Sequence, residues 1–85
     1  MSHFEYTIFG ELTQGFEDQT KNIITIINNG GSPFFLQKYY DEEVEGKKNR
    51  TIVLTSQFNM IQHVLNLFSG SKVNLQAYHK ISLIQ

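Results

Sequence analysis

TIVLTSQFNMIQHVLNLFSG, residues 51–70, is the stretch that decides the fold of this chain. Its first residues alternate polar and apolar, as in a strand with one buried face, and this places Ile52 and Leu54 in the core. Ser56 is the expected N-cap of a helix that Gly70 would end. Apolar residues recur at helical spacing and cover about half of this helix. They are Phe58, Met60, Ile61, Val64, Leu65, Leu67 and Phe68.

The other side of the same helix contains amides and a histidine, and it has none of the lysine and glutamate that usually solvate a helix. Its residues are Asn59, Gln62, His63 and Asn66, with Met60 at the border. Interface cores are depleted in charge and enriched in methionine and aromatic residues. We therefore predict that these five residues contact a partner protein. The plainer alternative is a solvated face, for which amides suffice.

An earlier strand and helix are expected in the first third of the chain. Residues 3–9 alternate, with Phe4, Tyr6 and Ile8 facing the core, and the pattern breaks at Gly10. Thr13 is the expected N-cap of the helix. Residues 28–33, NNGGSP, would end it, because glycine adopts the left-handed cap and proline cannot continue a helix. One helical face is apolar apart from one threonine: Phe16, Thr20, Ile23, Ile24 and Ile27.

A hairpin is expected over residues 34–55. A two-residue turn at Glu45-Gly46 sets Asp41 opposite Arg50 and Glu43 opposite Lys48. The dense charge of residues 41–50 is then explained as a solvated, salt-bridged hairpin. In the first arm the alternation is ambiguous, because two apolar sets compete for the buried face. One set is Phe34, Leu36 and Tyr40, and the other is Phe35 and Tyr39.

With a last strand over residues 78–84, the element order is strand, helix, strand, strand, helix, strand. In 85 residues without repeat or linker, this order predicts one α+β domain, residues 1–85, of the split βαβ (ferredoxin-like) type. Its four-stranded antiparallel sheet would carry two helices on one face, with the first and third strands central. The alternative is an α+β fold whose aromatic hairpin stands apart from the sheet.

Composition argues against several functional classes. The chain has no cysteine, which excludes thiol catalysis and zinc ribbons, and its net charge of −1 with a single arginine argues against binding of duplex DNA. His3, His63 and His79 fall in three different elements, and neither a phosphate-binding loop nor a nucleophile elbow is present. We therefore expect no metal, no cofactor and no enzymatic activity.

The N-terminal residues give no targeting signal. They have neither a basic region nor an apolar run of signal-peptide length, and no segment approaches the ~20 apolar residues of a membrane span. We expect a cytoplasmic protein that does not contact a membrane.

The sheet face turned away from the helices is the second predicted contact surface, with Phe9, Val53, Tyr78 and Lys80 on it. A split βαβ sheet is also the platform of the RNA-recognition motif, whose aromatic side chains stack bases. The resemblance to that family is to the order of elements only. Its third strand places basic and aromatic residues where this chain has Thr51, Val53 and Thr55.

The sequence thus predicts a non-enzymatic protein-interaction module that acts as a regulator, adaptor or inhibitor and forms a homodimer. Small phage or plasmid proteins that inhibit host machinery share this profile. Two alternatives remain open. One is a single-stranded RNA-binding domain that uses the open sheet face, and the other is a small-molecule-sensing regulatory domain with its ligand at a dimer interface.

Overall fold

The computed structural model describes residues 2–68 and, by their backbone, residues 74–81. Its elements are β1 (Ser2–Glu11), α1 (Gln14–Asn28), β2 (Phe35–Val44), β3 (Lys47–Ser56), α2 (Ile61–Leu67) and β4 (Asn74–Ile81). The predicted α+β class, with an antiparallel sheet and two helices, is confirmed. Gly70, the expected end of the second helix, lies outside the described residues, as do residues 82–84 of the last predicted strand.

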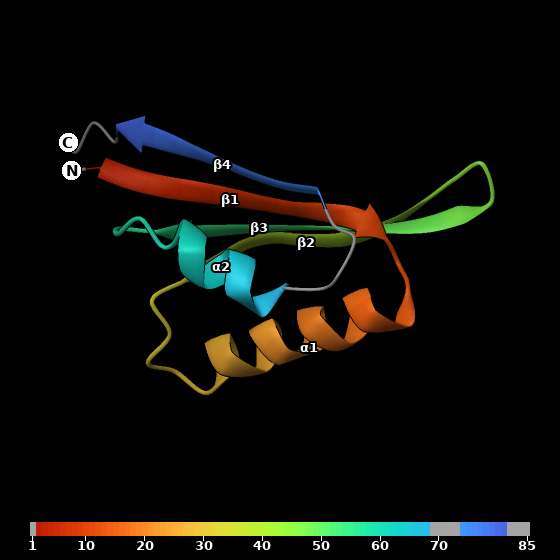
Figure 1. The fold of residues 1–85 in the computed structure, drawn as a ribbon, viewed down its shortest axis with the longest axis horizontal. Coiled ribbons are helices and arrows are strands. Elements are labelled where there is room, and N and C mark those ends of the chain that lie inside the picture. The colour runs from red at the N-terminus through yellow and green to blue at the C-terminus, as the bar shows by residue number, and fades with distance from the viewer. Residues whose placement is uncertain (1, 69–73, 82–85) are drawn as a thin grey trace.

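The central strands β1 and β3 pair antiparallel, with Tyr6 opposite Leu54 and Ile8 opposite Ile52. On its other side β3 pairs with β2, and the backbone of β4 pairs with β1. Paired residues share a face, so these four apolar side chains point to one side of the sheet. Figure 1 shows α1 and α2 on one side of the sheet. We call this side the helix face and the opposite side the open face.

The core lies between the helix face and the two helices. The predicted core residues Tyr6, Ile8, Ile52 and Leu54 are fully buried, and Phe4 is half-buried against them. Burial of one such side chain contributes about 1.5–3 kcal/mol relative to leaving it in water. The other buried apolar residues come from both helices and from the loop before β2: Phe16, Ile23, Phe34, Val64 and Phe68.

The first helix forms as its sequence predicts. Thr13 caps α1, and its hydroxyl oxygen accepts a hydrogen bond from the Phe16 amide at 3.3 Å. After the helix ends, Gly30 and Gly31 have φ angles of 80° and 73°, in the left-handed region that glycine adopts without strain. The prediction of a glycine-based helix end is therefore confirmed, and both glycines take part.

The predicted N-cap at Ser56 is wrong. β3 continues through Ser56, which pairs with Phe4 of β1, and its buried hydroxyl accepts a hydrogen bond from the Phe58 amide at 3.1 Å. Continued sheet pairing satisfies the backbone here in place of a helical turn. α2 therefore begins later, with Met60 as an N-cap that makes no side-chain hydrogen bond.

Two residues of the predicted apolar stripe do not contact the core as expected. Phe58 lies before the helix and is 68% exposed, and Leu65 is 46% exposed. Val64 and Phe68 are buried, as predicted, while Met60, Ile61 and Leu67 are half-buried. The stripe that contacts the core is thus narrower than the sequence indicates. Phe58 is lost from it because it lies in the loop before α2, whereas Leu65 is on the helix but exposed.

The hairpin has the predicted register, with Asp41 opposite Arg50 and Glu43 opposite Lys48. In its first arm, a register shift between Leu36 and Lys38 marks a β-bulge. A bulge adds one residue and reverses the side to which the following side chains point. Leu36 and Tyr39 consequently share the helix face, while Phe35 and Tyr40 share the open face. Neither of the two alternating sets considered above is correct.

Candidate functional site

Exposed large apolar side chains gather on β2. This strand contributes Phe35, Leu36, Tyr39, Tyr40 and Val44, whereas Phe9, Ile26, Phe58 and Leu65 are distributed over the rest of the described chain. β2 is also an edge of the sheet, with β3 as its neighbour. One side of its backbone therefore has no strand partner within residues 2–68 and 74–81, and unpaired strand edges are templates for pairing with another chain.

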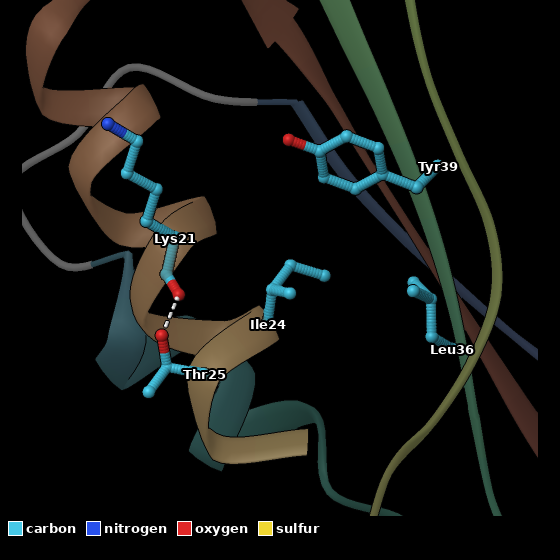
Figure 2. Close-up of a pocket in the computed structure, with 5 residues that line it drawn as sticks. All are labelled: Lys21, Ile24, Thr25, Leu36 and Tyr39. Carbon is cyan, nitrogen blue, oxygen red and sulfur yellow. Dashed lines mark hydrogen bonds between the residues drawn. The ribbon is translucent and has the colours of Figure 1, made fainter. Parts of the chain in front are cut away.

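A groove of about 550 Å³ separates β2 from α1 on the helix face. Leu36 and Tyr39 line its β2 side, and Lys21, Ile24 and Thr25 line its α1 side. Figure 2 shows the Tyr39 ring and Ile24 projecting toward each other across it. The groove exists because α1 covers the central strands and leaves Leu36 and Tyr39 38% and 41% exposed.

The chemistry of this groove is that of an apolar binding surface with one cation at its rim. The Lys21 ammonium forms an ion pair with Glu17 at 3.2 Å, one helical turn away. The Thr25 hydroxyl donates to the Lys21 carbonyl at 2.9 Å and is thereby satisfied within the helix. What remains for a ligand is the apolar surface of Ile24, Leu36 and the Tyr39 ring, which suits an apolar side chain of a partner.

Arg50 lies next to Tyr39, one of the groove residues, and corrects the prediction of a solvated pair. Its side chain is buried, with Nε 2.7 Å from Asp41 Oδ1 and Nη2 3.0 Å from Asp41 Oδ2. Nη1 donates to the Thr20 hydroxyl of α1 at 2.8 Å, and the guanidinium lies 5.0 Å from the Tyr39 ring centroid. The rest of the charged hairpin is exposed, as predicted.

Arg50 also determines the protonation of its partner. Its hydrogen bonds, helped by its positive charge, hold the pKa of Asp41 below the ordinary value, although partial burial acts in the opposite direction. The same hydrogen bonds raise the pKa of Arg50. Both groups are therefore charged at neutral pH, and together they attach β2 to β3 and, through Thr20, to α1.

Of the five contact residues predicted on the second helix, three lie on α2, because the helix begins only at Ile61. Asn59 lies in the loop before it, and Met60 is its N-cap. Asn59, Gln62, His63 and Asn66 are exposed, and Met60 is half-buried against the core. Gln62 donates to Asn66 at 3.3 Å, and the His63 ring stacks on Phe34 with centroids 6.0 Å apart. Asn59 is instead joined to the start of the helix, because its Oδ1 atom accepts a hydrogen bond from the Ile61 amide at 3.3 Å. The role of these five residues in binding a partner stays a prediction.

Two of the predicted sheet residues, Phe9 and Val53, lie on the opposite side of the molecule from α2. Phe9 is exposed and Val53 is half-buried, and the pairing register places both on the open face. Tyr78 and Lys80 pair by their backbone with Glu5 and His3, and their side chains lie outside the described part of the chain. The two predicted surfaces are therefore separate. On the edge strand β2, Tyr39 is on the helix face and Tyr40 is on the open face.

Neither a metal site nor a membrane span is found in the described part of the chain. Among residues 3–68, whose side chains the structure describes, no three histidine, aspartate or glutamate residues are grouped so that they could hold a metal ion. None of the helices described is long and apolar enough to cross a bilayer.

Comparison with known proteins identifies fold likeness only. No protein-family model matches the chain, and no curated protein matches its sequence. The de novo designed protein Foldit4 is similar in structure, with a TM-score of 0.55 and 6% identity over 96% of this chain and 98% of that one. The uncharacterized protein TM1266 from Thermotoga maritima has a TM-score of 0.58 and 12% identity over 93% of this chain and 98% of its own. At such identities the likeness concerns the fold alone.

The sequence does not reveal the groove between α1 and β2. Its one signal is the failure of residues 34–40 to alternate cleanly, which indicates a strand with apolar side chains on both faces. A strand inside the sheet would bury both faces, and an edge strand leaves part of them exposed. Local sequence does not distinguish these cases, because strand order depends on contacts between distant segments.

Proposed function

We propose that this chain is a small protein-interaction module that works without catalysis, as a regulator, adaptor or inhibitor, and that it self-associates. We also infer that its fold is the ferredoxin-like split βαβ type, with β4 completing a four-stranded antiparallel sheet. The strand order β2-β3-β1-β4 and the two similar structures support this fold. The cytoplasmic location and the lack of a cofactor remain predictions from the sequence.

The observation that carries the function is the concentration of exposed apolar side chains on the edge strand. Leu36 and Tyr39 line an apolar groove beside α1, on the strand whose backbone edge has no partner in the described chain. Apolar patches next to a free strand edge are typical of surfaces that another protein covers. Such a surface needs no catalytic group to act.

Single-stranded RNA is a second candidate partner, favoured by one row of the open face. Tyr40 is opposite Thr51, and Thr51 is opposite Phe9, so that two exposed aromatic rings flank a threonine. The Lys38 ammonium lies 5.2 Å from the centroid of the Tyr40 ring. Aromatic rings with an adjacent cation stack bases in RNA-binding sheets. The groove likewise favours the alternative of a small ligand enclosed at a dimer interface.

The proposal is tested by purifying the tagged full chain from its native host and identifying co-purifying proteins by mass spectrometry. Leu36→Lys places a charge in the groove and should reduce a specific partner by about tenfold or more. Ile26→Lys is the matched control, because Ile26 is similarly exposed on α1 but does not line the groove. A partner retained by Leu36→Lys would exclude the groove as the contact.

Two further measurements separate the alternatives. His63→Glu combined with Asn66→Lys tests the polar side of α2, and loss of the partner only in this variant would assign binding to that side. A raised ratio of absorbance at 260 to 280 nm in the purified protein, lost in high salt, would instead support RNA binding. Circular dichroism of each variant confirms that it is folded.

A further inference from the structure

We propose that a second copy of this chain pairs with the edge of β2, antiparallel and in one register, with Tyr40 facing its own counterpart across a twofold axis. The proposal rests on the self-association in the proposed function, and it adds the surface and the register. Figure 1 shows β2 as the strand that continues into the hairpin. From Lys38 to Val44 its pairing with β3 is regular, so this segment can pair with a second strand without a bulge.

Symmetry and charge select the register. A twofold axis perpendicular to the sheet puts the same face of both copies on the same side. Two paired residues must share a face, and successive residues alternate between faces, so the numbers of two paired residues add up to an even sum. With Tyr40 at the axis, Lys38 is opposite the partner's Glu42, and this pair occurs twice. Lys38 and Glu42 both lie on the open face, because their β3 partners are Val53 and Asn49. Opposite charges in directly facing positions stabilise an antiparallel pair.

The other registers are less favourable, and two of them bring like charges together. With the axis at Asp41, this carboxylate faces the same carboxylate of the partner. With the axis at Glu42, the two Glu42 side chains face each other, and Asp41 faces the partner's Glu43 in two further pairs. An axis at Tyr39 pairs Lys38 with Tyr40 and leaves no ion pair. Charges on an edge strand commonly prevent pairing with other chains. In β2 they are self-complementary in one register and repulsive in two others.

The side chains at the edge are already arranged for this register. Lys38 is positioned over the Tyr40 ring at 5.2 Å, on the face where the partner's Glu42 would lie. On the helix face, Tyr39 would be opposite the partner's Asp41, whose carboxylate Arg50 holds in place. The pairing places the two α1–β2 grooves beside each other on one continuous sheet. Pairing ends at the bulge before Lys38, so the interface is small and its dimerisation depends on concentration.

Charge exchange tests the register on the full chain, with sedimentation equilibrium over a range of concentrations. Lys38→Glu alone sets glutamates against glutamates, and Glu42→Lys alone sets lysines against lysines. Each variant should raise the dimer dissociation constant by roughly tenfold or more. An equimolar mixture of the two variants should restore dimerisation, because every facing pair is then opposite in charge. The controls Lys47→Glu and Glu11→Lys make the same charge changes at exposed positions outside β2.

A cysteine pair provides an independent measure, since the chain contains no other cysteine. Tyr40→Cys should form a disulfide-linked dimer on mild oxidation, whereas Phe35→Cys, on the same strand but before the bulge, should not. Dimers that persist in both charge variants would overturn the register and leave self-association intact. A chain that remains monomeric at every concentration would overturn this inference together with the self-association in the proposed function. The search for a foreign partner with Leu36→Lys would then still test the interaction module itself.

Discussion

Asp41 and Arg50 are joined by two hydrogen bonds, of 2.7 and 3.0 Å, in which the guanidinium is buried and the carboxylate is 44% exposed. This bidentate pair connects β2 to β3 directly beside the groove. The guanidinium needs partners on all sides because a buried charge without them costs several kcal/mol. Thr20 of α1 provides the next one, at 2.8 Å.

The hydroxyl of Thr20 should therefore contribute more to the stability of the fold than a threonine hydroxyl inside a helix usually does. Thr20→Val keeps the shape of the side chain and leaves Arg50 Nη1 without this acceptor, which should cost about 1–3 kcal/mol in the free energy of unfolding. Thr25→Val is the control, because the Thr25 hydroxyl bonds only to the exposed Lys21 carbonyl, and it should cost less than about 0.5 kcal/mol. Urea unfolding of both variants measures the difference, and equal costs would contradict the role of Thr20.

The Asp41–Arg50 pair should make stability fall in acid. The pKa of Asp41 is lowered from 3.8 in the folded chain, so the unfolded chain binds this proton more readily. The contribution is fully present above the unfolded pKa and is lost as the pH falls through the lower folded pKa. Because the carboxylate is partly exposed, Asp41→Asn should cost only about 1 kcal/mol near neutral pH.

The measurement is the stability difference between the wild type and Asp41→Asn as the pH is lowered from neutral. This difference should shrink below a pH of about 3.8. A difference that stays constant into strong acid would show that the charge of Asp41 is not its source. Glu42→Gln, on the adjacent exposed position of β2, should change stability near neutral pH by less than about 0.5 kcal/mol.

Tyr6 should stabilise the start of α2 from the middle of the sheet. The ring is fully buried, and its hydroxyl accepts a hydrogen bond from the Met60 amide and lies 3.5 Å from the Asn59 Oδ1 atom. Tyr6→Phe should cost about 1–2 kcal/mol, because the Met60 amide would lose this acceptor and the side chain of Met60, the N-cap residue, makes no hydrogen bond. Amide hydrogen exchange should accelerate in α2 before it does in α1. Tyr40→Phe removes the same atom from an exposed ring and should change neither measurement.

The hairpin turn should respond in opposite directions to two substitutions. Glu45 and Gly46 both have positive φ angles, 54° and 78°, as a type I′ turn requires. Glu45→Asn introduces a residue that tolerates this region and should stabilise the chain by about 0.5 kcal/mol. Gly46→Ala adds a Cβ atom at a strained φ and should destabilise it by about 1 kcal/mol. Thermal unfolding of the pair tests the turn type, and shifts of the same sign would contradict it.

Features that depend on short stretches of sequence could be predicted. The turn at Glu45-Gly46 sets the hairpin register, and the alternation of residues 3–9 and 50–55 identifies Tyr6, Ile8, Ile52 and Leu54 as core. Thr13 and the two glycines after α1 define that helix. In each case the physical cause acts over a few neighbouring residues, so the pattern is visible in the chain itself.

Ser56 shows where local reasoning fails. A serine before an apolar periodic run is a good N-cap signal, yet Ser56 extends β3 because Phe4, more than fifty residues away, pairs with it. Phe58 is displaced into an exposed loop for the same reason. Local propensity is worth about 1 kcal/mol at such a position, and strand pairing with a distant segment outweighs it.

By itself the sequence determined the α+β class, the order of the elements, the hairpin register and the centre of the core. Only the tertiary structure decided that the bulge divides β2, that Arg50 is buried beneath α1, and that the groove opens between Leu36, Tyr39 and α1. These features arise where segments distant in sequence meet, and their energies depend on which strand becomes the edge of the sheet. No local pattern contains that information, so the candidate contact surface becomes visible only when the chain is folded.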